Sequence, residues 1–300
     1  TDVIENGWFD NCSFQTMTIP ASVTTIAPNA FTNCTGVTAF VVKPENRDYK
    51  APGGILFSYD LTKLIRYPVN KDGASYTVPS YVNEIAANAF YKSGKLTSVT
   101  IADDTTITDI RERSLTIGDN AFKECENLGS VDFGNQVIEI GKSAFEGDKK
   151  LVAVMLPDSV KTLGEAAFKN CAAMSTLALS NSLEVIEKSS FEDCKALTSV
   201  KLPHGMTEVG EAAFKNCGKM KSLIFTPWLV TIGNYAFQAC KELTTVEFHV
   251  GLKTIGAYAF ADCSKLKGEE DLVLRLPESV TSVGEGAFSK SDIEGFTVLK

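Results

Sequence analysis

The chain of 300 residues has 44% hydrophobic and 22% charged residues, a composition typical of a folded protein rather than a disordered one. Its net charge of −8 argues against nucleic acid and anionic membrane surfaces as partners, because both attract basic proteins. No apolar run approaches the roughly 20 residues that a membrane-spanning helix needs, so we expect no membrane insertion in this segment.

A repeat marked by phenylalanine runs through the sequence. Each of the eight cysteines follows a phenylalanine by three residues. A fixed period of this length indicates one supersecondary unit stacked on copies of itself, a solenoid in which a single elongated domain spans residues 1–300. We number the positions of each coil from its phenylalanine, taken as zero. The phenylalanines recur every 23 residues in the central region, at Phe122, Phe145, Phe168, Phe191, Phe214, Phe237 and Phe260.

Both ends of the chain fall within a repeat unit. Residues 4–9 match the part of a coil that contains the phenylalanine, and residues 293–298 match a strand with no second leg. The exposed ends of a solenoid need polar caps, and neither end has an obvious one. Either the chain is a segment of something longer or atypical residues cap it.

The first break in the period predicts a β-hairpin insertion at about 44–75. Two alternating strands flank a turn at 60–62. The hairpin contains Phe57, Tyr59, Arg66 and Tyr67, on strands that no stacked neighbour is obliged to cover. Protein interfaces are enriched in Tyr, Phe and Arg, so these four residues are candidates for partner binding. The alternative is that their rings pad the hairpin against the adjacent coil.

The regular coil predicts three legs. Val200 and Leu202 alternate with a polar residue, which is the pattern of a half-buried strand, and Pro203 ends that strand. A second extended leg follows, and Phe168 and Cys171 then have the i, i+3 spacing of one helical face. Shorter insertions interrupt the period near 102–113 and 267–272.

The three legs predict an α/β solenoid of about eleven coils. Strands of successive coils pair at about 4.8 Å, whereas helices that pack side by side need about 10 Å. This mismatch predicts a curved, right-handed stack with a parallel sheet on the concave face and short helices on the convex side.

The cysteines are best explained as buried free thiols. Equivalent side chains in a stack point the same way, and the five consecutive cysteines from Cys171 to Cys263 cannot pair off completely. Metal binding is disfavoured because no Cys-x-x-Cys occurs and His204 and His249 are the sole histidines. No nucleophile–histidine–acid arrangement or phosphate-binding loop is evident, so we expect neither a catalytic site nor a cofactor.

The outward side chains of the strands form a second candidate binding surface, because the concave strand face is where solenoids usually bind. Met155 and Ile224 point outward despite being apolar, which suggests a contact surface. We take as candidates at this position Met155, Lys201, Ile224 and Glu247.

The unit closely resembles the 23-residue leucine-rich repeat of the BspA-like family of bacterial surface proteins. The span from Cys194 to Cys217 shows the motif almost complete, with Leu197, Val200, Leu202, Pro203, Met206, Val209, Gly210, Ala213 and Phe214. The hairpin also resembles an insertion familiar in that family. The resemblance covers essentially the whole chain and implies a secreted or cell-surface protein, with several members implicated in adhesion.

These observations lead to a functional hypothesis. We expect a non-enzymatic, extracellular or cell-surface module that binds a protein partner, such as a host protein, as a surface adhesin does. The alternative is a carbohydrate-binding surface protein, for which the tyrosine-rich insertion would supply stacking platforms.

Overall fold

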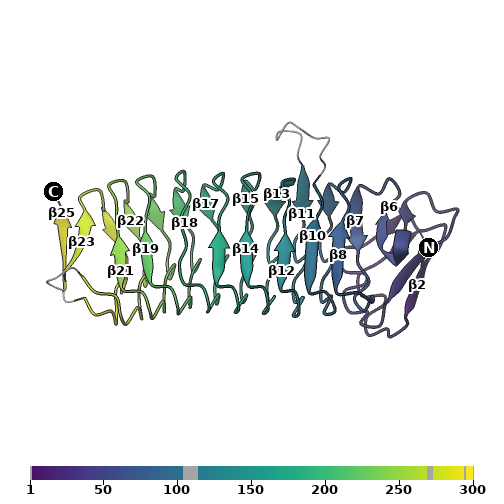
Figure 1. The fold of residues 1–300 in the computed structure, drawn as a ribbon, viewed down its shortest axis with the longest axis horizontal. Coiled ribbons are helices and arrows are strands. Elements are labelled where there is room, and N and C mark those ends of the chain that lie inside the picture. Colours follow the sequence, from purple (N-terminus) through teal and green to yellow (C-terminus); the bar gives the residue numbers. More distant parts are fainter. Residues whose placement is uncertain (1, 104–113, 269–272, 294, 300) are drawn as a thin grey trace.

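The chain forms a long solenoid of β-strands, seen from the side in Figure 1. The computed structural model describes residues 2–103, 114–268, 273–293 and 295–299. The predicted insertions near 102–113 and 267–272 lie largely outside these residues. The two ends of the chain lie at opposite ends of the stack (Figure 1).

In most coils the first leg is a strand that pairs in parallel with the first leg of a neighbouring coil, as predicted. The pairing is in register, so that Val99 lies beside Val131 and Val154 beside Leu177. Eleven such strands, together with the coil that Lys201 joins by a single bridge to Ala178, give twelve turns, close to the expected eleven. These strands are β2 (Thr16–Ile19), β4 (Ala39–Val42), β8 (Ser75–Val78), β10 (Ser98–Ile101), β12 (Ser130–Asp132), β14 (Ala153–Met155), β16 (Thr176–Ala178), β19 (Ser222–Ile224), β21 (Thr245–Glu247), β23 (Val273–Pro277) and β25 (Gly295–Leu299).

The second leg is a shorter strand, and these strands form a second set of parallel sheets. Most of these strands bury at least one apolar residue, such as Ile140 or Leu163. The second-leg strands are β1 (Val3–Ile4), β3 (Thr25–Ile26), β7 (Lys63–Arg66), β9 (Glu84–Ile85), β11 (Leu115–Ile117), β13 (Val137–Ile140), β15 (Thr162–Leu163), β17 (Val185–Ile186), β18 (Glu208–Val209), β20 (Thr231–Ile232), β22 (Thr254–Ile255) and β24 (Ser282–Val283).

The third leg is not a helix, so the prediction of short helices on a convex side is wrong. The described residues contain one helical element, the 3₁₀ turn η1 (Pro52–Gly54) in the hairpin. Each regular third leg instead has left-handed residues two positions before and two positions after its phenylalanine, such as Ala166 and Asn170 around Phe168. Left-handed residues interrupt the uniform backbone that an α-helix requires, so the leg becomes a series of tight turns.

Hydrogen bonds between coils explain this conformation of the third leg. The backbone N–H groups of Ser143, Phe145 and Gly147 each donate to a carbonyl of the following coil, at 2.8 Å in all three cases. These bonds hold the third legs at the same spacing as the strands. A Cβ on Gly164 would lie 2.6 Å from the carbonyl carbon of Gly141, so glycine permits this close approach.

The stack therefore lacks the mismatch that would bend it. All three legs repeat at strand spacing, and Figure 1 shows a nearly straight rod where the sequence predicted a curved one with a concave sheet. The handedness of the coils stays a prediction, favoured by the right-handed rule for crossovers between parallel strands.

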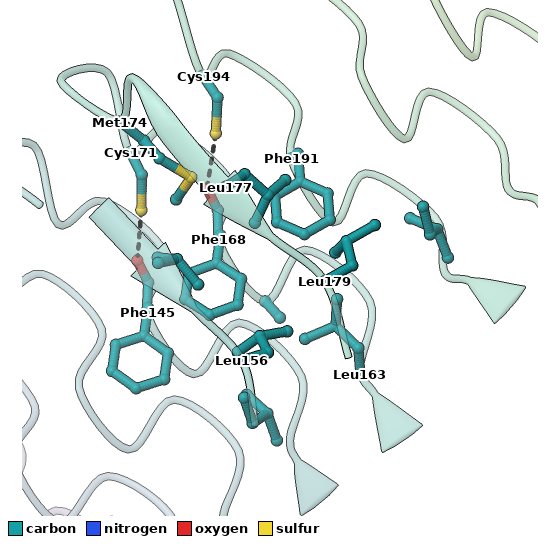
Figure 2. Packing of buried hydrophobic residues seen from close by; sticks show 14 of the residues in the cluster. Phe145, Leu156, Leu163, Phe168, Cys171, Met174, Leu177, Leu179, Phe191 and Cys194 are labelled. Carbon is teal, nitrogen blue, oxygen red and sulfur yellow. Dashed lines mark hydrogen bonds between the residues drawn. The ribbon is translucent and has the colours of Figure 1, made fainter. Parts of the chain in front are cut away.

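A continuous column of phenylalanine rings fills the interior. From Phe90 to Phe288 successive rings lie 4.5 to 5.7 Å apart and within 10° of parallel. Figure 2 shows Phe145, Phe168 and Phe191 in this column, packed against leucine side chains from the first and second legs. Burial of one such ring contributes roughly 1.5–3 kcal/mol, and stacking makes the buried row continuous.

The cysteines form a second interior column of free thiols, as predicted. From Cys34 onward, each thiol donates a hydrogen bond to the carbonyl of the phenylalanine in the preceding regular coil, as Cys171 does to Phe145 at 3.2 Å and Cys194 to Phe168 at 3.3 Å (Figure 2). Burial raises the pKa of the Cys194 thiol to about 12. These thiols act as small core residues that also satisfy a backbone acceptor.

Two surface columns of the third legs alternate in charge from coil to coil. At position +1 the ion pairs Lys123–Glu146 and Lys169–Glu192 each measure 2.8 Å. At position −3 the pairs are Lys142–Glu165 at 3.5 Å and Lys188–Glu211 at 2.8 Å. Each coil in this region therefore faces opposite charges on both of its neighbours.

The predicted hairpin is present and becomes part of the stack. Strand β5 (Tyr49–Lys50) pairs antiparallel with β6 (Leu56–Ser58), and β6 pairs antiparallel with β7. Strand β7 in turn pairs in parallel with β9, so it serves as the second leg of its own coil. Tyr67 then takes the phenylalanine place, with its ring centroid 5.1 Å from that of Phe90.

Candidate functional site

One column of outward side chains runs along the first-leg strands. Met155 lies beside Ala178, which bridges to Lys201, and Ile224 lies beside Glu247. We call these five residues the outer column. At about 4.8 Å per coil it spans roughly 19 Å, so the structure brings together all four residues that the sequence predicted for this face.

The pleat of the strands determines which side chains are exposed. Val154 and Leu223 are buried, whereas Met155 is 59% exposed and Ile224 is 64% exposed. Alternate residues of a strand point to opposite faces, so these two large apolar side chains cannot reach the core. They contribute little to the packing of the solenoid and leave apolar surface accessible to a partner.

The turns after β19 and β21 each add an exposed apolar side chain. Trp228, after β19, is 58% exposed, and Val250, after β21 in the following coil, is 71% exposed. We call Ile224, Trp228 and Val250, which lie on these two adjacent coils, the apolar corner. Exposed aromatic and branched side chains are typical of the centre of a protein interface.

His204 fixes the orientation of Trp228. The indole Nε1–H donates to Nε2 of His204 at 2.8 Å, and the two rings are in edge-to-face contact with centroids 5.8 Å apart. This bond requires the His204 tautomer with its proton on Nδ1. Because the indole donor is already satisfied, the exposed part of Trp228 offers mainly its apolar ring surface.

Glycines occupy the place of Trp228 in both neighbouring coils. A Cβ added to Gly205 would meet no heavy atom within 4 Å, so the space beside it is open. Gly251 has φ +134, and a Cβ there would lie 2.2 Å from the carbonyl oxygen of Pro227, so the turn requires glycine. The indole therefore projects beyond the turns on either side.

Charged side chains border the apolar corner. Lys201 and Glu247 are exposed and occupy the coils before and after Ile224 in the outer column. Nε2 of His249 lies 3.9 Å from a carboxylate oxygen of Glu247. An apolar centre with a polar rim is the usual composition of a protein-binding patch.

The hairpin residues do not form such a surface. Phe57, Arg66 and Tyr67 are buried, so the expectation that no neighbour covers them is wrong, whereas Tyr59 is 38% exposed. The physical reason is that β7 continues the second leg and directs its alternate residues into the core. The Tyr59 ring is held by the ammonium group of Lys50, 3.8 Å from the ring centroid.

The thiols and the histidines of the described residues were also compared with the requirements of a reactive site. Burial raises the pKa of the Cys34 thiol to about 11, which disfavours the nucleophilic thiolate. Within the described ranges no cluster of three or more His, Cys, Asp or Glu side chains could hold a metal ion. Nε2 of His204 accepts the hydrogen bond from Trp228, so its partner in that bond is an indole and not a serine or cysteine nucleophile.

The sequence interpretation missed Trp228 and Val250. A signal was present, because the position of Trp228 is occupied by the small residues Ser159, Ser182, Gly205 and Gly251 in four other regular coils, although Gln136 occupies it in a fifth. Stacking of coils does not explain a large, exposed apolar residue at this position. Such a departure from the repeat indicates an outward role.

Comparisons with known proteins agree with the fold. A model of the BspA type leucine rich repeat region, in 6 copies, matches residues 2–51, 70–116, 115–241 and 186–300 and omits the hairpin strands β6 and β7. No curated protein matches the chain. None of the helices among the described residues has the length and apolarity to cross a membrane.

Solved structures of bacterial leucine-rich repeat proteins are similar. A protein from Eubacterium ventriosum is 26% identical in sequence, with a TM-score of 0.56. The alignment covers 98% of this chain and 63% of the Eubacterium protein. The pneumococcal vaccine antigen PcpA is 26% identical with a TM-score of 0.61, covering 70% of this chain and 50% of its own. A protein from Bacteroides ovatus, 20% identical with a TM-score of 0.54, covers 99% of this chain and 87% of its own and supports the fold alone.

The chain thus spans about half to two thirds of the length of the first two of these proteins. The family model matches nearly all of the sequence, and the matched ranges contain the stacked coils that form the buried columns. The chain belongs to the BspA-type leucine-rich repeat family.

Proposed function

We propose that the chain is a non-enzymatic, extracellular module of a bacterial surface protein that binds a protein partner through the outer column and the apolar corner. The observation that carries the proposal is the exposure of Ile224, Trp228 and Val250. These side chains lie on two adjacent coils and are not packed in the core. The role as an adhesin or host-binding protein and the extracellular location rest on the family to which the chain belongs.

The shape of this surface favours a protein partner over a sugar. The apolar corner combines branched aliphatic side chains with one tryptophan and has Lys201 and Glu247 at its border, as protein interfaces do. The carbohydrate alternative depended on tyrosine platforms in the hairpin region. Tyr67 is buried against Phe90 and offers no platform, whereas Tyr59 and Tyr81 are 38% and 50% exposed and are the tyrosines that the carbohydrate alternative relies on.

The test compares surface variants for capture of defined extracellular host proteins on an array. We expect Ile224→Asp and Trp228→Ala each to weaken capture by at least tenfold, which corresponds to about 1.4 kcal/mol. Val41→Asp and Trp8→Ala are matched controls, because both side chains are exposed near the other end of the rod. A glycan array run on the same sample distinguishes the alternative.

The outcomes separate the two functions. Loss of protein capture in the corner variants, with unchanged capture in the controls, supports the proposal. Equal losses in corner and control variants would move the binding site elsewhere. Specific glycan binding that survives both corner variants would replace the protein-binding function with the carbohydrate-binding one.

A further inference from the structure

A cleft of about 320 Å³ lies where the hairpin interrupts the stack, far along the chain from the apolar corner. One wall comes from the coil that contains Phe31, and the other comes from β7 and from the coil that contains Phe90. Ligand pockets begin at about 300 Å³, so this cleft has the size for a small molecule. Its lining includes Ile26, Thr32, Ile65, Arg66, Ala86 and Ala87.

The cleft exists because the hairpin coil lacks a third leg. Tyr67 fills the phenylalanine place, and Pro68 follows it at once, so the chain leaves the stack before a further set of turns can form. The third legs of the flanking coils consequently face each other across a gap. At one end they are joined by the Asn88 side chain, whose Nδ2 donates to Oδ1 of Asn29 at 2.8 Å.

Arg66 replaces part of the missing leg. Its Nη2 donates to the Phe31 carbonyl at 3.3 Å and to the Tyr91 carbonyl at 3.2 Å, and its Nη1 donates to the Asn88 carbonyl. In regular coils the phenylalanine carbonyl accepts from the cysteine of the following coil. The guanidinium therefore takes the place of a cysteine thiol that this coil does not possess.

The charge of Arg66 has no counter-charge in the described part of the chain. All three of its hydrogen bonds go to carbonyl oxygens, and its Nε–H donates to none of the described residues. Burial lowers the pKa of Arg66 to about 10, so the side chain remains a cation at neutral pH. A buried cation without an anion is costly, and an anion that reaches it is correspondingly favoured.

The other charges of the cleft cancel. Nζ of Lys63 lies 2.6 Å from Oε1 of Glu84, so this pair at the rim is neutral overall. Arg66 thus leaves the lining with a net charge of +1, from two cations and one anion. The remaining walls are largely apolar, formed by Ile26, Ile65 and Ala86.

We propose that this cleft binds a small free carboxylate with an aromatic or branched aliphatic body. The carboxylate pairs with the guanidinium of Arg66, which lines the cleft, in a charge-assisted hydrogen bond, and the body packs between Ile26 and Ile65. This site is separate from the surface proposed for the protein partner and takes a ligand of a different class. Binding there also stabilises the hairpin coil, which has no third leg of its own.

The experiment measures binding of phenylacetate to the full chain by heteronuclear NMR titration and by thermal shift. Phenylacetamide is the comparison ligand, because it has the same shape without the charge. We expect phenylacetate to bind at millimolar or lower concentration, to raise the melting temperature and to bind at least tenfold more tightly than the amide. Binding of 3-methylbutanoate in the same range would extend the class to branched aliphatic acids.

Variants that fill the cleft test its location without removing Arg66. Ala87→Phe and Thr32→Phe place a ring in the cleft from opposite walls, and we expect either to abolish binding. Ala257→Phe is the matched control, since Ala257 occupies the same repeat position in a distant coil, and it should bind as the unmodified chain does. The NMR spectrum of each variant without ligand checks that the fold is kept.

Several results would overturn the proposal. Absence of binding by both carboxylates at 10 mM would do so, as would equal affinity for phenylacetate and phenylacetamide. Retained binding in both folded filling variants would place the ligand elsewhere. Much tighter binding of the peptide Gly-Gly-Phe than of phenylacetate would assign the cleft to a chain terminus rather than to a free small molecule.

Discussion

Asp148 accepts a hydrogen bond of 2.8 Å from the backbone N–H of Cys125 through Oδ1, while its Oδ2 has no hydrogen-bond partner among the described residues. It occupies the cysteine place of its coil, between Cys125 and Cys171 in the thiol column. Burial raises the pKa of the Asp148 carboxyl well above its ordinary value. The folded chain therefore keeps this carboxyl protonated at pH values where the unfolded chain releases the proton.

We predict that Asp148→Cys stabilises the protein at neutral pH by about 1–3 kcal/mol, because it removes a buried polar atom without a partner. The folded pKa of Asp148 is the higher one, so its contribution is fully present below the unfolded pKa near 4 and is lost as the pH rises toward the folded pKa. The gain from the variant should grow between pH 4 and pH 8. Urea unfolding across this range measures it, and a gain that is constant or shrinks would contradict the assignment.

The phenylalanine column should be sensitive to truncation at any interior coil. Phe191 is fully buried, with ring centroids 5.7 Å from Phe168 and 5.2 Å from Phe214. We expect Phe191→Ala to lower the free energy of unfolding by about 3–5 kcal/mol and Phe191→Leu to cost less. Denaturant titration followed by circular dichroism gives both values. A loss below 1 kcal/mol for the alanine variant would mean that neighbouring coils refill the space.

The thiol column predicts a characteristic pattern of reactivity. Seven of the eight cysteines are buried and Cys12 is partly exposed, and all eight are free. We expect about one thiol to react with a thiol reagent in the native protein and eight to react in denaturant without reductant. Four or fewer in denaturant would show that disulfides link neighbouring coils.

The alternating charge columns predict a cost for reversing one charge. Lys169 pairs with Glu192 at 2.8 Å and faces Glu146 on its other side. Lys169→Glu should lower the free energy of unfolding by about 1–2 kcal/mol, since it replaces attractions to Glu192 and Glu146 by two repulsions, and added salt should reduce the loss.

Two further variants check this prediction. Lys201→Glu is the control, because its neighbours Ala178 and Ile224 in the outer column carry no charge. Lys169→Glu combined with Glu192→Lys should recover part of the stability. Equal losses of unfolding free energy in Lys169→Glu and Lys201→Glu would show that the charge columns do not stabilise the stack through ion pairs between coils.

The repeat period and the identity of the buried residues were readable from the sequence, because stacking places every inward position under the same constraint in each coil. Phe145, Cys171 and Leu179 are buried for this reason. The exposure of Met155 and Ile224 followed from strand alternation alone. These predictions needed only local spacing and the requirement that apolar rows become continuous.

The third leg could not be predicted in the same way. Ala166 and Ala212 are good helix formers, yet both have left-handed backbones. Their conformation is imposed by hydrogen bonds to the next coil, as from the Ala166 N–H to Lys188, which local propensity does not report. Asparagine at positions such as Asn120 and Asn170 was the available hint, because asparagine tolerates this conformation.

The hairpin shows a further limit of local reasoning. Its strands were predicted from their alternation, but the burial of Arg66 depends on a leg that is missing from its own coil. Only the three-dimensional stack reveals that Tyr67 is the phenylalanine equivalent and that Arg66 spans to the Phe31 carbonyl.

The alternating charge columns have a consequence for how such a protein can change in length over generations. Lys123, Glu146 and Lys169 occupy one column, so excising the coil of Glu146 would set two lysines side by side, and in the other column Asp119 beside Glu165. Copying one coil would likewise juxtapose identical charges. Within this region, insertion or deletion of an even number of coils keeps opposite charges beside each other. We therefore expect coils to be gained and lost in pairs during evolution.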